Sequence, residues 1–471
     1  MDYDVLIIGS GPAGQHAAWQ AARMGKRIAM IERKPKLGGA GLQTGTIPSK
    51  AMREVAYLAS RSGYGGMRQS LSPEQRSQHG LLADIIRRKQ GVIAQQESLI
   101  LQKLLLNGVA LLPGEASFVN SHTIQVTDTN GGTRQVSAEV IILASGSRPR
   151  RPADIPFDKK IILDSTSILN LRHLPSSLLV VGGGVIACEF VSIFAALGVQ
   201  VCVVDSHKQL LAYLSEDVVK VLADSFLDMG VTFYMQERVT EIQQTASGPL
   251  TILESGKRIK TDAILYAQGR EPNSAGLNLE GAEIQAQDGW IEVNKHFQTS
   301  VPHIYAVGDL IGRPALASTG MEQGRAAVMY AFSGEKHEAA ENLPMAVYTI
   351  PEISYVGKNE KEIQQESIPY VIGRANFRDS ARGQIIGDAH GLLKLIVDTR
   401  NEKILGVHIV GEQASELIHI GQLVMNLNGS VRDLVNNVFN YPTLAECYKL
   451  AASDCIHQLT SKKKLSADYA D

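Results

Sequence analysis

The chain has 471 residues, which is too long for one ordinary domain and predicts about three. Hydrophobic residues make up 44% and charged residues 20%, a globular composition that excludes wholesale disorder. The 46 Lys and Arg residues nearly balance the 48 Asp and Glu residues, so the chain lacks the basic field on which nucleic-acid binding depends.

Cysteine usage and hydropathy predict a cytoplasmic protein. The four cysteines are too few for a disulfide scaffold, form no CxxC pair and show no zinc-site spacing with histidine. Asp2 and Asp4 lie where a signal peptide needs basic residues, and no run reaches the roughly 18 apolar residues of a membrane span. We therefore expect a reducing compartment, no membrane segment and no metal.

The chain begins with a pattern typical of a nucleotide-binding unit. An apolar run at residues 5–8 leads into GSGPAG at residues 9–14, then an alanine-rich helical stretch, then an apolar run that ends at Glu32. Glycines in such a turn let the backbone approach a pyrophosphate, and the N–H groups of the helix N-terminus bind it. The acid that ends the second run would accept hydrogen bonds from a ribose.

Residues 81–106 have apolar residues at helical spacing and predict a long helix whose apolar stripe packs in the core. Residues 109–143 predict several strands, with a turn at Asn130-Gly131-Gly132.

The first pattern recurs in the middle of the chain. Residues 178–181 lead into GGGVIA at residues 182–187, a helix and an apolar run ending at Asp205. The acid follows the first glycine at the same distance in both units, from 9 to 32 and from 182 to 205. Two such units predict two dinucleotide sites, hence a flavin enzyme that uses a nicotinamide nucleotide. Asp205 favours NAD(H), because its carboxylate would repel the 2′-phosphate of NADP(H), although His207 and Lys208 could partly offset that repulsion.

Beyond about residue 343 the pattern changes. Strands are predicted at residues 391–397 and 404–410 and a helix at 415–427, without a glycine fingerprint. This predicts a separate C-terminal domain, followed by a polar, flexible tail at residues 461–471.

Four further motifs make the chain resemble the class I pyridine nucleotide–disulfide oxidoreductases, the family of dihydrolipoamide dehydrogenase, glutathione reductase and mercuric reductase. They are GGAGLQTGTIPSK at residues 38–50, ASGS at 144–147, AQGREPN at 267–273 and YAVGD at 305–309. The likeness extends over about residues 3–460. It implies an α/β fold with two Rossmann-like domains, for FAD and NAD(P), and a C-terminal α+β dimerisation domain.

The resemblance also implies domain boundaries and site residues. It places the FAD-binding domain at residues 1–150, with its second, central part at 275–342, the NAD(P)-binding domain at 151–274 and the dimerisation domain at 343–460. It implies that FAD is bound by Gly9, Gly11, Pro12, Ala13, Gly14, Glu32, Arg33, Thr46, Lys50, Ala116, Ser145, Gly146, Asp309 and Ala317, and NAD(P) by Gly182, Gly184, Val185, Ile186, Glu189, Asp205, Val239 and Gly269.

The chain departs from the family where disulfide chemistry needs specific residues. The two redox cysteines are replaced by Gly41 and Thr46, and the His of a His-Pro-Thr-x-x-Glu base is replaced by Tyr441, ahead of Glu446. A thiolate attacks a disulfide, and neither glycine nor threonine can replace it. Reduction of lipoamide, glutathione or Hg(II) is therefore not expected.

These losses resemble the soluble pyridine nucleotide transhydrogenases, a subfamily with which the chain also shares YTIPEIS at residues 348–354 and FNYPT at 439–443. The resemblance implies ping-pong hydride transfer between nicotinamide nucleotides through FAD, in a homodimer. It further implies that Lys50 and Glu189 form a pair beside the flavin, and that Tyr441 and Glu446 reach the partner subunit's flavin.

Two alternatives remain open from the sequence. The first is an NAD(P)H-dependent reductase of quinones or another small acceptor, which would enter the flavin face emptied at Gly41 and Thr46. The second is a flavin-bound redox sensor with little turnover, against which the presence of both Lys50 and Glu189 argues.

Overall fold

The computed structural model describes residues 1–61, 80–245, 248–312, 314–336 and 341–468. The chain divides into two compact units. Unit 1 comprises Met1–Met52, Ser77–His173 and Gln268–Ala339, and unit 2 comprises Arg53–Arg76, Leu174–Ala267 and Ala340–Asp471. Each glycine motif thus lies in a unit of its own.

Unit 1 is built on a mainly parallel sheet with the strand order β3-β2-β1-β6-β5-β4, and β19 pairs with β6. Pairing is parallel among β1, β2, β3, β6 and β19 and antiparallel along β4-β5-β6. Residues 5–8 of β1 are all apolar and buried, as expected for a parallel strand covered on both faces. The strands are β1 (Tyr3–Ile8), β2 (Ile28–Glu32), β3 (Ala110–Pro113), β4 (Glu115–Asn120), β5 (Thr123–Thr127), β6 (Thr133–Leu143) and β19 (Ile304–Ala306).

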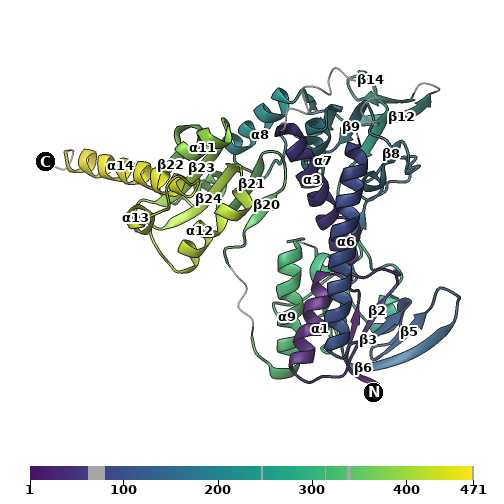
Figure 1. Cartoon of the computed structure of the whole chain (residues 1–471). Coiled ribbons are helices and arrows are strands. Elements are labelled where there is room, and N and C mark those ends of the chain that lie inside the picture. The colour runs from purple at the N-terminus through teal and green to yellow at the C-terminus, as the bar shows by residue number, and fades with distance from the viewer. Residues whose placement is uncertain (62–79, 246–247, 313, 337–340, 469–471) are drawn as a thin grey trace. The chain divides into compact units, whose positions relative to one another are not determined.

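Helices α1 (Pro12–Arg23) and α9 (Ala317–Ser333) run side by side in unit 1 (Figure 1). The predicted long helix is confirmed as α6 (Leu81–Leu106), but its apolar stripe is only partly in the core, since Ile85 is buried and Leu99 is exposed. The remaining elements of this unit are α2 (Gly39–Gln43), the first part of α3 (Thr46–Arg61), β7 (Ser147–Pro149), β8 (Ile162–Leu163), β16 (Arg270–Pro272), β17 (Ala286–Gln287), β18 (Trp290–Ile291) and the 3₁₀ turns η1 (Ile168–Asn170), η2 (Leu279–Ala282) and η3 (Gly308–Ile311).

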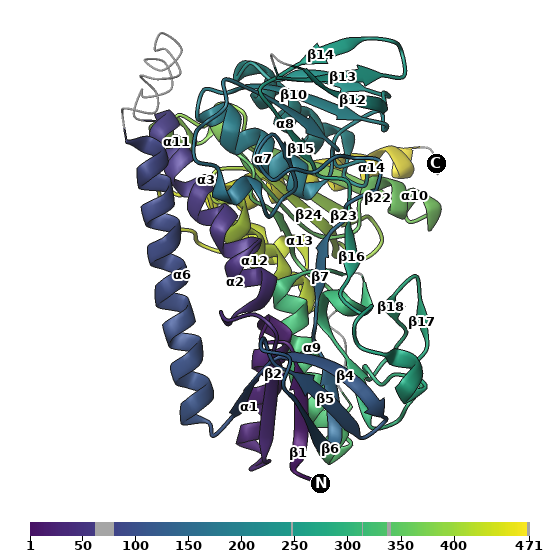
Figure 2. The same cartoon turned by 90° about the vertical axis from the view of Figure 1, so that its right-hand side faces the viewer.

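The second glycine motif opens a parallel sheet in unit 2. Its strands follow the order β11-β10-β9-β15, and an antiparallel sheet β12-β13-β14 follows in the chain (Figure 2). The elements are β9 (Ser177–Val181), α7 (Val185–Ala196), β10 (Gln200–Asp205), α8 (Glu216–Asp228), β11 (Thr232–Met235), β12 (Val239–Thr245), β13 (Gly248–Leu253), β14 (Arg258–Lys260) and β15 (Ala263–Tyr266).

The C-terminal part of unit 2 is an antiparallel sheet, β20-β21-β24-β23-β22, with helices packed against it. The strands and helix predicted here are confirmed within a residue. The elements are β20 (Met345–Val347), β21 (Glu352–Gly357), α10 (Glu360–Gln365), β22 (Tyr370–Asn376), η4 (Phe377–Asp379), α11 (Ala381–Ile386), β23 (Leu392–Asp398), β24 (Ile404–Gly411), α12 (Ala414–Asn426), α13 (Val431–Asn436) and α14 (Glu446–Asp468).

The predicted tail differs from the structure. Helix α14 continues to Asp468, beyond the start of the flexible segment expected at residue 461. Lys, Leu and Ala all favour helix, so these residues extend the turn that precedes them. Within the described ranges, no helix is both long and apolar enough to cross a membrane.

Candidate active site

The first glycine turn lies between β1 and α1, and its backbone requires glycine. Gly9 has φ +107°, and a Cβ on it would lie 2.4 Å from the carbonyl oxygen of Ala144. A Cβ on Gly14 would lie 2.0 Å from the carbonyl oxygen of Gly9. A Cβ on Gly11 would meet no protein atom within 4 Å, so this glycine leaves the backbone accessible rather than relieving a clash. That is the role expected of the middle glycine beside a pyrophosphate.

Glu32 ends β2 beside this turn, and backbone groups orient its carboxylate. Ser10 donates to Oε2 from its N–H at 3.0 Å and from its hydroxyl at 2.6 Å. The N–H of Lys34 donates to Oε1 at 2.9 Å. The carboxylate is thus fixed at the C-terminal end of a parallel strand, where α/β sheets bind ribose.

The second turn repeats this geometry in unit 2. The N–H of Gly183, one residue after the first glycine as Ser10 is, donates to Asp205 Oδ2 at 2.5 Å. The N–H of His207, two residues after the acid as Lys34 is, donates to Asp205 Oδ1 at 2.8 Å. Like Gly11, Gly184 would place a Cβ in open space. The duplication inferred from the sequence therefore extends to individual hydrogen bonds.

The other end of the unit 1 site contains Asp309 in η3. Its Oδ2 accepts the Ser147 hydroxyl at 2.7 Å, and Arg270 Nε lies 3.7 Å away while donating to that same hydroxyl at 2.7 Å. Burial lowers the pKa of Arg270, although the charge of Asp309 opposes that shift. The hydroxyl of Ser145 is buried with no hydrogen-bond partner among the described residues. A buried hydroxyl left without a partner fits a cofactor that would bind it.

The remaining residues predicted to bind FAD lie at ends of unit 1 elements. Pro12 and Ala13 open α1, Ala317 opens α9, Ala116 lies in β4 and Arg33 follows β2. Gly146 precedes β7 and Gly269 precedes β16, so Gly269, predicted to contact NAD(P), belongs to unit 1. In unit 2, Val185 and Ile186 open α7 and Val239 opens β12.

The predicted pair Lys50 and Glu189 lies on α3 and α7. Thr46 is the exposed first residue of α3, and Lys50 is half-buried one turn later. Glu189 is buried, and its Oε1 accepts the backbone N–H of Tyr348 at 3.0 Å. The loop 348–351 therefore holds the carboxylate of Glu189 in place.

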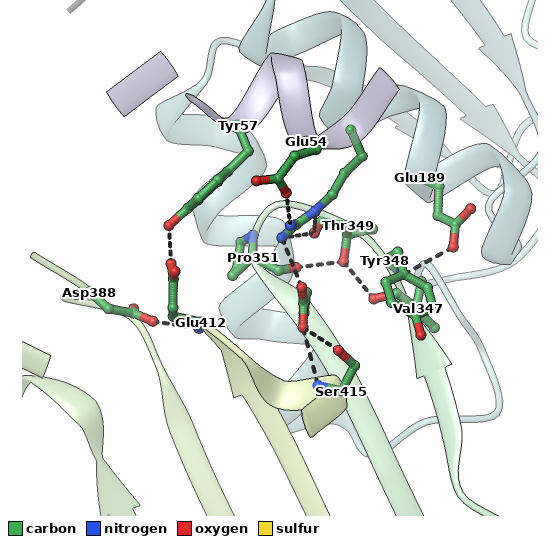
Figure 3. A network of polar contacts seen from close by, with 12 residues as sticks. Glu54, Tyr57, Glu189, Val347, Tyr348, Thr349, Pro351, Asp388, Glu412 and Ser415 are labelled. Atoms are coloured by element: carbon green, nitrogen blue, oxygen red, sulfur yellow. Dashed lines mark hydrogen bonds and ion pairs between the residues drawn. The ribbon is translucent and has the colours of Figure 1, made fainter. Parts of the chain in front are cut away.

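The loop 348–351 also contacts a residue of α3 for which the sequence predicted no role (Figure 3). Arg53 donates from Nε and Nη2 to the carbonyl oxygen of Thr349 at 3.2 Å, and Nη2 lies 3.2 Å from Oε1 of Glu352. The other oxygen of Glu352 accepts the N–H and hydroxyl of Ser415. Arg53 lies in α3 three residues after Lys50, and Glu352 lies in the YTIPEIS motif. The signal available in the sequence was this acid within a largely apolar motif, because a buried carboxylate needs a cationic partner.

Tyr441 and Glu446 lie in the C-terminal part of unit 2. Tyr441 is 73% exposed, and Glu446 is the first residue of α14. Their predicted reach to the flavin of a partner subunit stays a prediction.

The four cysteines are free, and burial raises the pKa of every one of their thiols, to about 11 for Cys447 and about 12 for Cys455. Cys188 is buried and Cys202 is half-buried. His408 is buried, whereas His419 is exposed.

Two family models cover most of the chain. Residues 3–324 match the pyridine nucleotide-disulphide oxidoreductase model, and residues 343–452 match the dimerisation domain of the same family. The chain belongs to the pyridine nucleotide-disulphide oxidoreductase family. The fold class predicted from the sequence is thereby confirmed.

Members of this family with solved structures or curated names resemble the chain over nearly its whole length. The soluble pyridine nucleotide transhydrogenase of Mycobacterium tuberculosis is 44% identical over 97% of this chain and 98% of the relative. The soluble pyridine nucleotide transhydrogenase of Pseudomonas putida is 40% identical over 97% of this chain and 99% of the relative. The structure of LpdA from Mycobacterium tuberculosis superimposes with a TM-score of 0.87 at 29% identity, covering 96% of this chain and 99% of that one.

The family implies FAD and a nicotinamide nucleotide, and the two turns fit both groups. In unit 1 the fit rests on Gly11, the oriented carboxylate of Glu32 and the unpartnered Ser145 hydroxyl. In unit 2 it rests on Gly184 and Asp205. The roles assigned to individual residues, and the domain boundaries, stay predictions.

Proposed function

We propose that this chain is a flavoprotein oxidoreductase that transfers hydride between nicotinamide nucleotides without a redox disulfide, a soluble NAD(P)⁺ transhydrogenase. The observation that carries the proposal is the full-length likeness, at 40–44% identity, to relatives that bear this name. The residues agree with it. Gly41, Thr46 and Tyr441 occupy the positions of the two cysteines and the histidine that disulfide reduction needs.

The chain's own residues would bind and orient the reactants. The turn at Gly9–Gly14, Glu32, Ser145 and Asp309 would hold FAD, and the turn at Gly182–Gly184 with Asp205 would hold the nucleotide. FAD, when bound, supplies the group that accepts a hydride from one nucleotide and returns it to another. Lys50 would place positive charge beside it, and the Tyr348 N–H would keep Glu189 positioned for that lysine.

We further propose a cytoplasmic homodimer that uses NAD(H) and accepts NADP(H). The match of residues 343–452 to a dimerisation domain supports the homodimer. The four free cysteines support a reducing compartment. The Asp205 carboxylate supports NAD(H) as the preferred nucleotide.

An anaerobic stopped-flow experiment tests the proposal. The yellow protein is mixed with NADH, and the bleached protein is then mixed with NADP⁺, thio-NAD⁺ or a quinone. We expect rapid bleaching and reoxidation by the second nucleotide at a rate that supports turnover. Reoxidation by quinone alone would make the chain a quinone reductase, and no bleaching by either nicotinamide nucleotide would refute hydride transfer altogether.

A further inference from the structure

The carboxylate of Asp205 has most of its hydrogen-bonding capacity already in use. Its Oδ1 accepts the backbone N–H of His207 at 2.8 Å and lies 2.7 Å from Nδ1 of the His207 ring. Its Oδ2 accepts the N–H of Gly183 at 2.5 Å. Since each carboxylate oxygen has two lone pairs, Oδ1 is saturated and Oδ2 retains one.

The contact with the His207 ring assigns the ring a role. A carboxylate only accepts hydrogen bonds, so Nδ1 must carry the proton and donate it to Asp205. The ring thus directs an N–H dipole, or a full positive charge when doubly protonated, at the acid that reads the ribose.

The backbone around this pair is fixed, whereas the ring is not enclosed. The N–H of Glu237 donates to the Asp205 carbonyl at 3.1 Å, and the N–H of Gln236 donates to the His207 carbonyl at 3.1 Å. The His207 side chain is nonetheless 65% exposed, against 10% for that of Asp205. Rotation about the side-chain bonds of His207 can therefore expose or cover Oδ1 without moving the strand end.

The two nucleotides make opposite demands on this carboxylate. The ribose of NAD(H) donates hydroxyl hydrogen bonds and needs vacant lone pairs on Asp205, while the 2′-phosphate of NADP(H) is repelled by its charge. A transhydrogenase must satisfy both demands at one site.

We propose that His207 is the specificity-determining residue that lets this single site accept both nucleotides. With its ring on Asp205 it offsets the negative charge, and NADP(H) is tolerated. With its ring turned away it yields Oδ1 to the ribose hydroxyls of NAD(H). The inference rests on the proposed use of both nucleotides and adds the residue that allows it.

Equilibrium binding tests the proposal on the FAD-loaded protein. The dissociation constants of NAD⁺ and NADP⁺ are measured by titration for the wild type, His207→Ala, His207→Arg and Lys208→Ala. We expect His207→Ala to raise the ratio Kd(NADP⁺)/Kd(NAD⁺) about fivefold, because Asp205 loses its neutralising donor and gains a lone pair. His207→Arg, which keeps a donor near Asp205, should restore the wild-type ratio or lower it.

Two comparisons test whether His207 acts through Asp205. The alternatives are a general effect of basic charge near the site and a purely structural effect of the substitution. Lys208 is exposed next to His207 and serves as the matched control, with an expected change in the ratio below about twofold. In an Asp205→Ala background, His207→Ala should also change the ratio by less than about twofold, because the carboxylate on which the ring acts is gone. An equal effect of Lys208→Ala, or an undiminished effect without Asp205, would overturn the proposal.

Failure of this proposal is distinguishable from failure of the proposed function. Binding requires no turnover, so the ratio is measured even if reduced protein passes no hydride to a second nucleotide. A wild type that binds NAD⁺ but not NADP⁺ would refute the role of His207 directly. An unchanged ratio in His207→Ala, with transhydrogenation intact, would refute that role alone.

Discussion

The two glycine turns hold their acids by equivalent backbone contacts. Glu32 and Asp205 each accept an N–H from the residue after the first glycine and another from two residues beyond the acid. Backbone donors leave these carboxylates little rotational freedom, so each presents its remaining lone pairs in one direction. That preorganisation suits recognition of a ribose diol better than a mobile side chain would.

Gly14 and Gly11 allow the steric and the ligand-binding roles of glycine to be separated. Gly14→Ala should destabilise the protein with or without FAD, because its Cβ would lie 2.0 Å from the Gly9 carbonyl oxygen. Gly11→Ala should leave the apoprotein's thermal midpoint within about 2 °C of the wild type but weaken FAD binding at least about tenfold, because its Cβ occupies space next to the turn. Thermal unfolding of the apoproteins and FAD titration measure both effects. Equal loss of apoprotein stability in the two variants would contradict the assignment.

Lys50 is predicted to act on the flavin rather than on the nucleotide. Lys50→Ala should slow anaerobic flavin reduction by NADH about tenfold or more, because it removes the positive charge that stabilises the reduced flavin. The apparent Kd for NADH should change less than about threefold. The saturation curve of the stopped-flow rate gives both quantities. Lys50→Arg, which retains the charge, is the control, and an equal loss in rate and affinity would make Lys50 a binding residue.

At the scale of elements, α3 links the predicted flavin contact to the C-terminal sheet. Its last turns are anchored within unit 2: Arg53 contacts Thr349 and Glu352, and Tyr57 donates its hydroxyl to Glu412 (Figure 3). Both acids border β21 and β24, whose register is set by antiparallel pairing. The loop 348–351 connects Arg53 to Glu189. Its Thr349 carbonyl accepts hydrogen bonds from Arg53, and its Tyr348 N–H donates one to Glu189. A change at Arg53 should therefore affect both stability and the position of Glu189.

Arg53→Met should lower the free energy of unfolding by about 3 kcal/mol, because it leaves the carboxylate of Glu352 buried without its cation. It should also slow flavin reduction, and combining it with Glu189→Gln should add little further slowing. Urea unfolding and stopped-flow rates measure the two effects. Tyr57→Phe, which removes the hydroxyl that donates to Glu412 and accepts from Arg61 but leaves the Arg53–Glu352 ion pair intact, should cost about 1 kcal/mol and leave the rate unchanged. If Arg53→Met and Glu189→Gln slowed flavin reduction additively, Arg53 would not act through Glu189.

At the scale of the whole molecule, a buried lysine joins the nucleotide-binding and C-terminal parts of unit 2. Lys394 in β23 is fully buried, and its Nζ lies 2.7 Å from both Asp217 of α8 and Glu360 of α10. Burial raises the pKa of each acid, but Lys394, together with Arg374 at Asp217 and Ser215 at Glu360, outweighs it, so both pKa values are lowered. These ion pairs stabilise the contact between the nucleotide-binding and C-terminal parts of unit 2. They weaken at low pH, when the two carboxylates become protonated.

Lys394→Met should lower the free energy of unfolding at pH 7 by about 3 kcal/mol, because two carboxylates then face each other without the lysine. The pH dependence follows from the lowered pKa values. The stabilisation is complete above the ordinary values of 3.8 and 4.5 and is lost as the pH falls through the lower folded values. Urea unfolding of the wild type between pH 6 and pH 3 should show this loss, and the variant should show a shallower one. An equal acid dependence in both proteins would contradict the assignment.

The sequence by itself determined the family and the two nucleotide-binding turns, each with its preceding strand, its helix and the strand that ends in an acid. These features depend on local chemistry: buried strands are continuously apolar, and tight turns need glycine at given positions. The loss of disulfide chemistry was also readable directly, because Gly41 and Thr46 contain no sulfur.

Only the tertiary structure decided which distant residues meet. The contact of Arg53 with Glu352, the bond from the Tyr348 N–H to Glu189, and the ion pair of Lys394 with Asp217 join segments more than a hundred residues apart. The partial exposure of the apolar stripe of α6 likewise depended on packing. The His207 ring on Asp205 is local in sequence, but its orientation required the fold. Composition and spacing specify which groups a chain contains, whereas their partners are selected by the side chains that other elements bring to the same place.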